Sequence, residues 1–399
     1  MALFQALVHD YGNRVRFPMG LWTFYLLNDP ESAGFVLSHH AHGFRKGPGL
    51  TNDNPLIGRG LLTVEGAEWA DARRRLSPVF RPRNVMAMRP GLEEALRRML
   101  DLWAQDPPED IEAAMMDLSL FLVLHNVFGA SDLSLAAIRR LTEDVDWLMR
   151  FFYHRSRTIW RFPYAFPFNR RYHRHAHRLI ATVRAMTTES RPYVTVHGHL
   201  AADSLTRQHE LLTLTIAGYE TTGHAMAWAL FLTATHPAVE AALLREARQQ
   251  VFPTPQTHPW TYAVILESLR LYPPVWLLSR TPTRTVPFDE GTFRPGDILL
   301  ISPWLMHRNA HVFPEPDAFR PERWLGSGPP PPYAFLPFGG GPRRCIGEDL
   351  ALTEAVLVVS RVLAQFHLTA LTPPNPPVFG GLTLRSRDGL RMRLQPRTE

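Results

Sequence analysis

The sequence predicts a mainly α-helical protein with a small β part, and three observations support this fold class. Apolar residues recur at spacings of three and four through most of residues 65–248, which is the period of amphipathic helices. Short apolar runs bounded by turn residues occupy 15–37 and 275–301 and predict strands. Between 307 and 346 the chain is rich in proline, glycine and phenylalanine and irregular. Since neither an internal repeat nor a linker is evident, we expect a single domain over 1–399.

Each element follows from these patterns in chain order. Residues 15–37 alternate and predict a β hairpin, and 40–64 carry the Gly, Pro and Asn of a long loop. The helical period then predicts helices over 65–76, 91–105, 110–128, 133–152, 170–188, 207–235, 238–250 and 259–271. Short strands are expected within 275–301, a last helix from Gly347 to Phe366, and strands with turns over 367–396.

Composition and charge exclude several classes of protein. Hydrophobic residues make up 45% and charged residues 20%, which is typical of a globular chain. No run approaches the ~20 apolar residues of a membrane span. The 43 basic and 37 acidic residues give a net charge of +6, but the arginines are scattered and no nucleic-acid motif accompanies them, so no nucleic-acid partner is expected. The first ten residues lack a basic leader, which predicts a cytoplasmic protein.

The strongest chemical signal surrounds Cys345, the single cysteine of the chain. It ends a glycine-rich run and precedes the last predicted helix. Glycine allows close approach of the backbone, and a helix N-terminus beside Arg343 and Arg344 favours an anion. We therefore expect a thiolate, which is a good ligand for iron. A glycine-rich turn with a buried cysteine is the alternative.

The loop around Cys345 matches the pattern F-x-x-G-x-R-x-C-x-G at Phe338, Gly341, Arg343, Cys345 and Gly347. In this loop the chain resembles the cytochromes P-450 of the bacterial soluble type, which are heme-thiolate monooxygenases. The resemblance implies that family's fold, a single-domain helical prism around heme, with heme b as cofactor. It implies that Cys345 is the axial ligand of the heme iron and that Phe338 and Gly347 belong to the cofactor-binding loop. A thiolate ligand favours O–O cleavage.

An acid and a hydroxyl, Glu220 and Thr221, stand in the long apolar helix predicted over 207–235, between Gly218 and Gly223. Interior glycine costs ~1 kcal/mol relative to alanine, and a buried acid costs more unless it is hydrogen-bonded. These residues therefore indicate a local function, although a solvated helix face is the alternative. The resemblance implies that Thr221 hydrogen-bonds dioxygen, that Glu220 helps to relay protons, and that a backbone distortion at the glycines makes room for O₂ and water.

Glu267 and Arg270 are three residues apart and share one face of a predicted helix. Most such pairs are surface ion pairs worth ~0–1 kcal/mol. The resemblance implies instead a buried E-x-x-R pair that is completed by Arg323, from the Pro-Glu-Arg segment 321–323. This triad is expected to lock the loop that carries Cys345 in place rather than to catalyse.

Trp69 and Arg73 are four residues apart and face the same way on a predicted helix. The resemblance implies that this pair contacts a heme propionate, and that Arg280 and Arg343 reach propionates as well. The bidentate fork of arginine suits such carboxylates.

The resemblance implies a reaction in which one oxygen atom from O₂ is inserted into an apolar substrate. The substrate expected first is a carotenoid or other terpenoid, and second a fatty acid. No electron-transfer segment is recognised, so a ferredoxin-type electron donor with its reductase is the expected partner, attracted by Arg74, Arg75, Arg81, Arg83 and Arg344. A peroxide-driven peroxygenase and a non-catalytic heme-based sensor or carrier are the alternatives.

Aromatic residues are concentrated over 147–172, and nine arginines but no acid lie over 150–184. By the resemblance this segment roofs the substrate pocket. Aromatic rings interleaved with cations suit a membrane interface, so we expect reversible contact with a membrane surface through residues 150–172. The alternative is that the rings are core and the arginines are solvated. The aromatic residues are Trp147, Phe151, Phe152, Tyr153, Trp160, Phe162, Tyr164, Phe166, Phe168 and Tyr172.

Overall fold

The structure is a computed structural model that describes residues 1–48, 56–130, 133–156, 169–186, 196–249, 251–289, 291–326 and 328–397. The chain forms two compact units, which are described separately below. The first consists of Met1–Thr51 and Leu266–Cys345, and the second of Asn52–Ile265 and Ile346–Glu399. A single domain over 1–399 stays a prediction.

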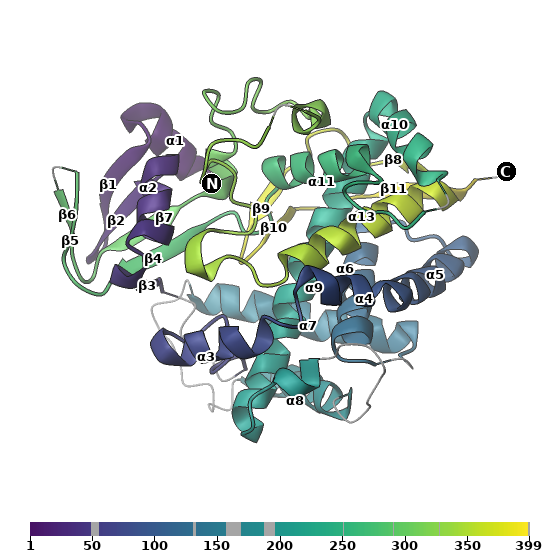
Figure 1. Cartoon of the computed structure of the whole chain (residues 1–399), viewed down its shortest axis with the longest axis horizontal. Coiled ribbons are helices and arrows are strands. Elements are labelled where there is room, and N and C mark those ends of the chain that lie inside the picture. Colours follow the sequence, from purple (N-terminus) through teal and green to yellow (C-terminus); the bar gives the residue numbers. More distant parts are fainter. Residues whose placement is uncertain are drawn as a thin grey trace. The chain divides into compact units, whose positions relative to one another are not determined.

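The first unit is built on a five-stranded sheet with the strand order β1-β2-β7-β4-β3 (Figure 1). The β1–β2 hairpin is antiparallel, whereas β2 pairs with β7 in parallel. A separate hairpin joins β5 to β6. The strands are β1 (Arg14–Met19), β2 (Trp22–Leu27), β3 (Phe44–Lys46), β4 (Leu278–Pro282), β5 (Val286–Phe288), β6 (Gly291–Phe293) and β7 (Ile298–Ile301).

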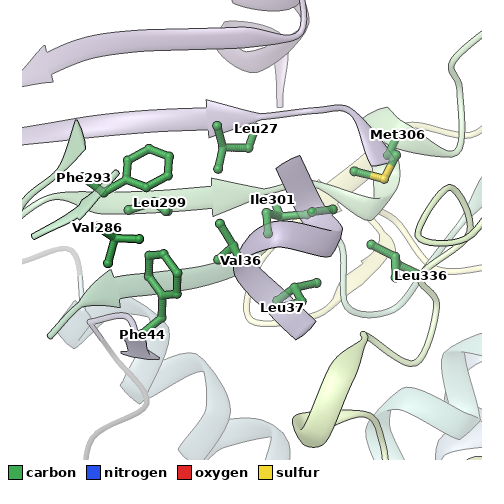
Figure 2. Close-up of a cluster of buried hydrophobic side chains, with 11 residues drawn as sticks. Leu27, Val36, Leu37, Phe44, Val286, Phe293, Leu299, Ile301, Met306 and Leu336 are labelled. Carbon is green, nitrogen blue, oxygen red and sulfur yellow. The ribbon is translucent and has the colours of Figure 1, made fainter. Parts of the chain in front are cut away.

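One face of this sheet packs against the helical segment that follows β2, and the contact forms an apolar core. Figure 2 shows Leu27 and Ile301 from the strands facing Val36 and Leu37 from that segment. Leu336, which precedes the Cys345 loop, belongs to the same buried cluster. The core therefore ties the start of the chain to the segment that leads into the cysteine.

The hairpin predicted over 15–37 is confirmed for β1 and β2 but wrong beyond them, because residues 30–39 are helical. Asp29 caps this helix by accepting a hydrogen bond from the Ser32 backbone N–H at 2.9 Å, and Pro30 occupies its first turn. Both features favour a helix start. The short helices of the first unit are α1 (Ala2–Tyr11), α2 (Pro30–Gly34), a π-helical turn (Phe35–His39) and α12 (Pro303–Met306).

The second unit is mainly helical, as the helical period predicts. Helix α11 (Pro259–Leu271) begins in it and supplies its last residues to the first unit. Two antiparallel strand pairs complete the second unit: β8 (Phe366–Ala370) with β11 (Met392–Pro396), and β9 (Val378–Gly380) with β10 (Leu384–Ser386). The other helices are α3 (Gly66–Leu76), α4 (Pro82–Ala87), α5 (Arg89–Gln105), α6 (Ile111–Leu122), α7 (Leu135–Ser156), α8 (Arg170–Met186), α9 (Ser204–Ala234), α10 (Pro237–Ala247) and α13 (Glu348–Gln365).

Helix α9 runs from Ser204 to Ala234 without a break, and the distortion expected at its glycines stays a prediction. The glycines serve the packing of α9 against α6 and the turn after it. A Cβ on Gly218 would lie 3.0 Å from Cγ2 of Val123, and one on Gly223 would lie 2.8 Å from Sδ of Met116 and 3.1 Å from the Met115 carbonyl oxygen. The absence of a side chain therefore permits the close approach of the neighbouring helix.

Within the described residues, no single helix is both long and apolar enough to cross a membrane. Helices α9 and α10 satisfy the length and hydropathy requirements only as a pair, across a bend of 114°.

Candidate functional site

The loop before Cys345 contains two glycines in the left-handed region of backbone conformation, which favours glycine. Gly339 and Gly341 have φ values of +71° and +64°. A Cβ on Gly341 would lie 1.8 Å from the carbonyl oxygen of Leu37, so any other residue would displace the backbone there. The backbone N–H of Cys345 donates to the Phe338 carbonyl oxygen at 2.9 Å, and that of Arg344 donates to the Gly341 oxygen at 3.0 Å. The loop thus folds back on itself and leaves the Cys345 side chain exposed.

A buried ion pair of the first unit joins Glu267 to Arg270, and both side chains have 0% exposure. Arg270 donates from Nε at 2.9 Å and from Nη2 at 2.8 Å to the two carboxylate oxygens, in a bidentate geometry. Nε of Arg323 reaches the same carboxylate at 3.1 Å. The structure therefore brings together the three residues that were expected to form the lock.

The Glu267 carboxylate accepts two further hydrogen bonds that the sequence did not reveal. The Arg320 backbone N–H donates at 2.9 Å and the Trp324 indole Nε1 donates at 2.9 Å. Arg270 also donates to three backbone carbonyls, those of His307, Pro316 and Ala318. This buried charge pair is therefore fully hydrogen-bonded, which is the condition under which such a pair is tolerated.

His307 links the lock to the segment that leads into the cysteine loop. Burial lowers the pKa of His307 to about 3, so its ring is neutral. Its Nε2 accepts from the Leu336 backbone N–H at 2.8 Å, and its Nδ1 donates to the Arg270 carbonyl oxygen at 3.2 Å. Only the tautomer with hydrogen on Nδ1 satisfies both contacts.

The second unit carries candidate residues of its own, on helix α9. Residues 211–233 are otherwise almost entirely buried, yet Ala217, Gly218 and Thr221 are partly exposed. The spacing of i, i+1 and i+4 places the three on one face of the helix. Oγ1 of Thr221 donates to the Ala217 carbonyl oxygen at 2.8 Å, so its lone pairs remain available to another partner. This strip of small residues is a surface on which a flat group can lie.

Glu220 points away from that strip. Its side chain is buried, and Oε1 accepts a hydrogen bond from Oγ1 of Thr383 at 2.6 Å. The structure therefore does not bring Glu220 and Thr221 into a direct hydrogen bond, because each is bonded to a different partner. Thr383 lies 163 residues further along the chain, and no sequence signal marked it.

The four residues expected at heme propionates are all half-buried. Trp69 and Arg73 lie on α3 of the second unit, one turn apart. Arg280 lies on β4 of the first unit and donates to the Ser279 carbonyl oxygen at 2.9 Å, and Arg343 lies in the cysteine loop. Gly347 is the N-cap residue of α13. A Cβ added to it would lie 3.9 Å from Cδ1 of the Phe80 ring.

The residues present fit heme b. In the first unit, Gly341 tolerates no Cβ in the loop that carries the exposed Cys345, and a thiolate is a ligand suited to heme iron. Arginines in both units suit the propionate carboxylates. The exposed strip on α9 suits the flat face of the macrocycle and an oxygen substrate. This donor set, on a mainly helical fold, defines a heme-thiolate oxidoreductase.

Comparison with known proteins gives the family. The cytochrome P450 family model matches residues 1–191 and 197–389, so the chain belongs to the cytochrome P450 family. Protein LUTEIN DEFICIENT 5 of Arabidopsis thaliana is 29% identical, over 98% of this chain and 73% of its own length. Cyclooctatin synthase of Streptomyces melanosporofaciens is 28% identical, over 92% of this chain and 85% of its own length. A 6-coordinated cytochrome P450 from Thermus thermophilus superimposes with a TM-score of 0.79 at 28% identity, over 100% of this chain and 98% of that chain.

The predicted family, fold class, enzyme class and cofactor are thereby confirmed. The protein is an oxidoreductase of the monooxygenase class, with heme b as its cofactor and O₂ as co-substrate.

Proposed function

We propose that the protein hydroxylates a large apolar substrate, with a carotenoid or other terpenoid as the first class and a fatty acid as the second. This proposal is carried by the compounds for which the relatives of this chain are named. These relatives include a protein named for lutein, a cyclooctatin synthase and a cyclooctat-9-en-7-ol 5-monooxygenase. Lutein is a carotenoid, and cyclooctat-9-en-7-ol is by its name a largely hydrocarbon alcohol. Cytochrome P450 4A11 of Homo sapiens, 28% identical, is a further relative.

In the proposed mechanism, Cys345 would hold the heme iron through its thiolate, and the Glu267 lock would keep the loop in place. The heme, when bound, supplies the activation of O₂. The glycine loop orients the sulfur through the hydrogen bond from the Cys345 N–H to the Phe338 oxygen. Trp69, Arg73, Arg280 and Arg343 hold the propionates.

Thr221 and Glu220 are proposed to handle protons. The Thr221 hydroxyl can move its hydrogen from the Ala217 oxygen to an oxygen atom on the exposed side of the helix, and it holds that atom by a hydrogen bond. Glu220, buried behind it, is the carboxyl group that resupplies protons. Because the carboxyl is bonded to Thr383, a rotation of its side chain is needed before it can serve Thr221.

The partly exposed hydroxyl of Thr221 favours a monooxygenase over a heme-based sensor or carrier, since binding without turnover requires no such group. It also weighs against a peroxide-driven peroxygenase, which needs no proton delivery to dioxygen. The discriminating measurement is product formed with a reducing partner and O₂, compared with product formed with hydrogen peroxide alone.

The substrate class is tested by the heme absorption spectrum during titration with four ligands: β-carotene, geranylgeraniol, palmitic acid and, as a small control, indole. A substrate that displaces water from the iron shifts its spin state. We expect spin-state shifts at micromolar concentrations of β-carotene or geranylgeraniol, a weaker response to palmitic acid and none to indole. A response to indole alone would contradict the proposed class.

Reversible membrane contact through residues 150–172 is part of this proposal. The structure reduces the number of aromatic side chains that are available for that contact. Trp147, Phe151 and Tyr172 stack on one another at centroid distances of 5.5 Å and 5.2 Å, so these rings cover each other as core residues do. Phe152 and Tyr153 are half-buried and contact Tyr172 and Phe379. The five aromatic residues over 160–168 lie outside the described residues. In the first unit, the hairpin tip exposes Leu21 at 99% and Trp22 at 58%, which the sequence reading missed.

Co-sedimentation with anionic vesicles tests the contact with two matched variants. One changes Trp160, Phe162 and Phe166 to Ser, and the other changes Leu21 and Trp22 to Ser. The proposal expects the wild type to bind and the first variant to bind less. Loss of binding in the second variant alone would move the contact to the hairpin tip, and absence of wild-type binding would refute it.

A ferredoxin-type electron donor is the proposed partner, and the structure changes which arginines can attract it. Arg75 is held by Asp71 and by the buried Glu210, at 2.9 Å and 2.6 Å, and Arg74 is bonded to Asp71. The proposal now rests on Arg81 and Arg83, both of which are exposed.

Stopped-flow reduction by a ferredoxin measures this attraction. Reduction should slow as ionic strength rises, because salt screens exposed charges. Arg81→Ala and Arg83→Ala should each lower the rate, whereas Arg393→Ala, an exposed arginine on β11, should not. Equal effects of all three variants would count against a specific docking face.

A further inference from the structure

Two buried polar residues of the second unit, His224 and Glu112, have no part in the roles proposed above, and they lie beside Glu220. His224 lies on α9 one turn after Glu220, and Glu112 lies in the first turn of α6. The exposed fractions are 3% for His224 and 7% for each glutamate. Three titratable groups are thus buried together directly behind the strip that carries Thr221. Because buried ionisable groups are costly unless they are paired, the cluster calls for an explanation.

The His224 ring faces one carboxylate with each of its nitrogens. Nδ1 lies 2.9 Å from Oε1 of Glu112, and this oxygen also accepts from the Ser386 backbone N–H at 3.1 Å. Nε2 lies 4.0 Å from Oε1 of Glu220, the oxygen bonded to Thr383. Among the described residues, Nε2 has no hydrogen-bond partner. The ring therefore connects the two glutamates, with a tight contact on one side and a loose contact on the other.

This arrangement requires a proton on the Glu220 side. With the hydrogen on Nδ1 donated to Glu112, a neutral ring would turn the Nε2 lone pair toward the lone pairs of the Glu220 oxygen. In a buried site such a contact is unfavourable. A hydrogen on Nε2, directed at Oε1 of Glu220, removes the conflict.

Glu112 lies near the start of α6. It is the second residue of the helix and follows the cap residue Asp110, which is partly exposed and accepts the Glu112 backbone N–H at 2.9 Å. The cluster runs from this end of α6 to the middle of α9, and the buried Glu112 carboxylate is its member nearest to the partly exposed cap.

We propose that His224 and Glu112 form a proton relay that recharges Glu220, an inference that rests on the proposed role of Glu220. His224 is a positioning and relay residue, because it acts through Glu220. Insertion of one oxygen atom from O₂ with reduction of the other to water consumes two protons and two electrons per turnover, and the relay supplies at least one of those protons.

The proton transfer involves no oxidation or reduction. The N–H bond at Nε2 of the imidazolium breaks, an O–H bond forms on Glu220, and the electron pair stays on the ring nitrogen. The neutral ring keeps its hydrogen on Nδ1, paired with the Glu112 carboxylate. Between turnovers a proton from solvent enters through Glu112, and rotation of the ring returns a protonated nitrogen to the Glu220 side.

A purely structural role is the competing explanation, since the contact from His224 to Glu112 ties α9 to α6. His224→Asn separates the two. The asparagine amide can take the place of Nδ1 as donor to Glu112, but it cannot carry a proton onward. A matched control is His236→Asn, a half-buried histidine at the end of α9 whose Nδ1 bonds to the Leu232 carbonyl oxygen.

The proton itself is observed by ¹⁵N NMR of histidine-labelled protein in the diamagnetic ferrous–carbonyl form, where loss of a signal in His224→Asn assigns it. We expect Glu220→Gln to shift the Nε2 signal toward the value of an unprotonated nitrogen, because the partner charge is gone. An Nε2 signal identical in wild type and Glu220→Gln would overturn the proposal. This readout does not depend on any substrate.

Turnover is measured with a reductase, a ferredoxin and β-carotene, as the fraction of consumed O₂ recovered as hydrogen peroxide and as the solvent deuterium isotope effect. His224→Asn should lower the coupled rate about tenfold, since a positioned proton donor contributes ~10²–10⁴ and the relay acts one step behind it. It should also enlarge the isotope effect, with melting temperature and carbonyl spectrum unchanged. An unchanged rate and isotope effect would reduce His224 to a structural residue.

The double variant keeps this inference separate from the proposed function. If Glu220→Gln uncouples the enzyme and His224→Asn adds nothing to it, the two residues act in one chain. If Glu220→Gln uncouples the enzyme but His224→Asn alone does not, only the relay is wrong. If Glu220→Gln has no effect, the proposed role of Glu220 fails, whatever His224 does.

Discussion

The Glu267→Ala variant tests the lock on the cysteine loop. The Glu267 carboxylate has 0% exposure and accepts from both Nε and Nη2 of Arg270, from Nε of Arg323, and from two further donors. Its removal leaves the Arg270 guanidinium buried without a counter-charge, because Arg270 is also fully buried. Breaking such a pair costs ~3–5 kcal/mol.

That loss of unfolding free energy is large for one side chain, but in a chain of this length it changes the melting temperature only modestly. An unfolding entropy of ~2.1 cal/mol/K per residue, applied to 399 residues, converts it to a fall of about 4–6 °C in melting temperature. Differential scanning calorimetry of the heme-loaded protein measures this. The ferrous–carbonyl spectrum of the same sample should lose part of its thiolate band, because the loop is no longer held.

Two further variants serve as controls for the melting-temperature measurement. Glu267→Gln retains the size of the side chain but not its charge, so it should fall between wild type and Glu267→Ala. Asp101→Ala breaks the exposed pair with Arg97, which is worth ~0–1 kcal/mol, and should shift the melting temperature by no more than about 1 °C. A Glu267→Ala protein as stable as Asp101→Ala, with a full thiolate band, would refute the lock.

Three more outcomes are expected. Thr221→Ala should still consume reductant while hydrogen peroxide rises and product falls, as measured by product per reductant; an unchanged ratio would show that the assigned role is wrong. Burial lowers the pKa of His307 from 6.5 to about 3, so between these pH values the unfolded chain binds more protons than the folded one. Acidification from pH 6.5 should therefore lower the free energy of unfolding, with a slope of up to ~1.4 kcal/mol per pH unit from this group. His307→Gln should flatten this slope, and a slope identical to that of the wild type would contradict the assignment. Burial raises the pKa of the Glu354 carboxyl group from 4.5 to about 8, so this group destabilises the fold increasingly as pH rises from 4.5 through 8. Glu354→Gln should therefore raise the melting temperature more at pH 8 than at pH 5. A larger gain at pH 5 would contradict this prediction.

The fold could be predicted from the sequence wherever a helix buries an apolar face. Helices α3 and α11 agree with their predicted ranges within one residue, because their apolar period is regular and their ends carry turn residues. Helix α1 was missed because none of its residues is buried, so it shows no sharp apolar face. The segment at 30–39 was misassigned because its apolar residues follow those of β2 without a break in hydrophobicity, although Asp29 and Pro30 marked the helix start.

The candidate site was predictable only where its signals are local. Cys345 and the Glu267–Arg270 pair belong to short motifs, and the structure places both as expected. The contacts that give Glu220 its surroundings come from Thr383 and, through His224, from Glu112, which are remote in sequence. Polar residues of this kind carry no periodic pattern. Trp324 and His307 were likewise missed as hydrogen-bond partners because their donors and acceptors are backbone groups or a glutamate more than 25 residues away.

The central claim is that Cys345 is the thiolate ligand of the heme, and the absorption spectrum of the ferrous–carbonyl complex tests it most directly. The wild type should show the red-shifted Soret band of thiolate ligation. Cys345→Ala and Cys345→His should both lose that band, since the chain has no other cysteine. An unchanged band in either variant would contradict the account.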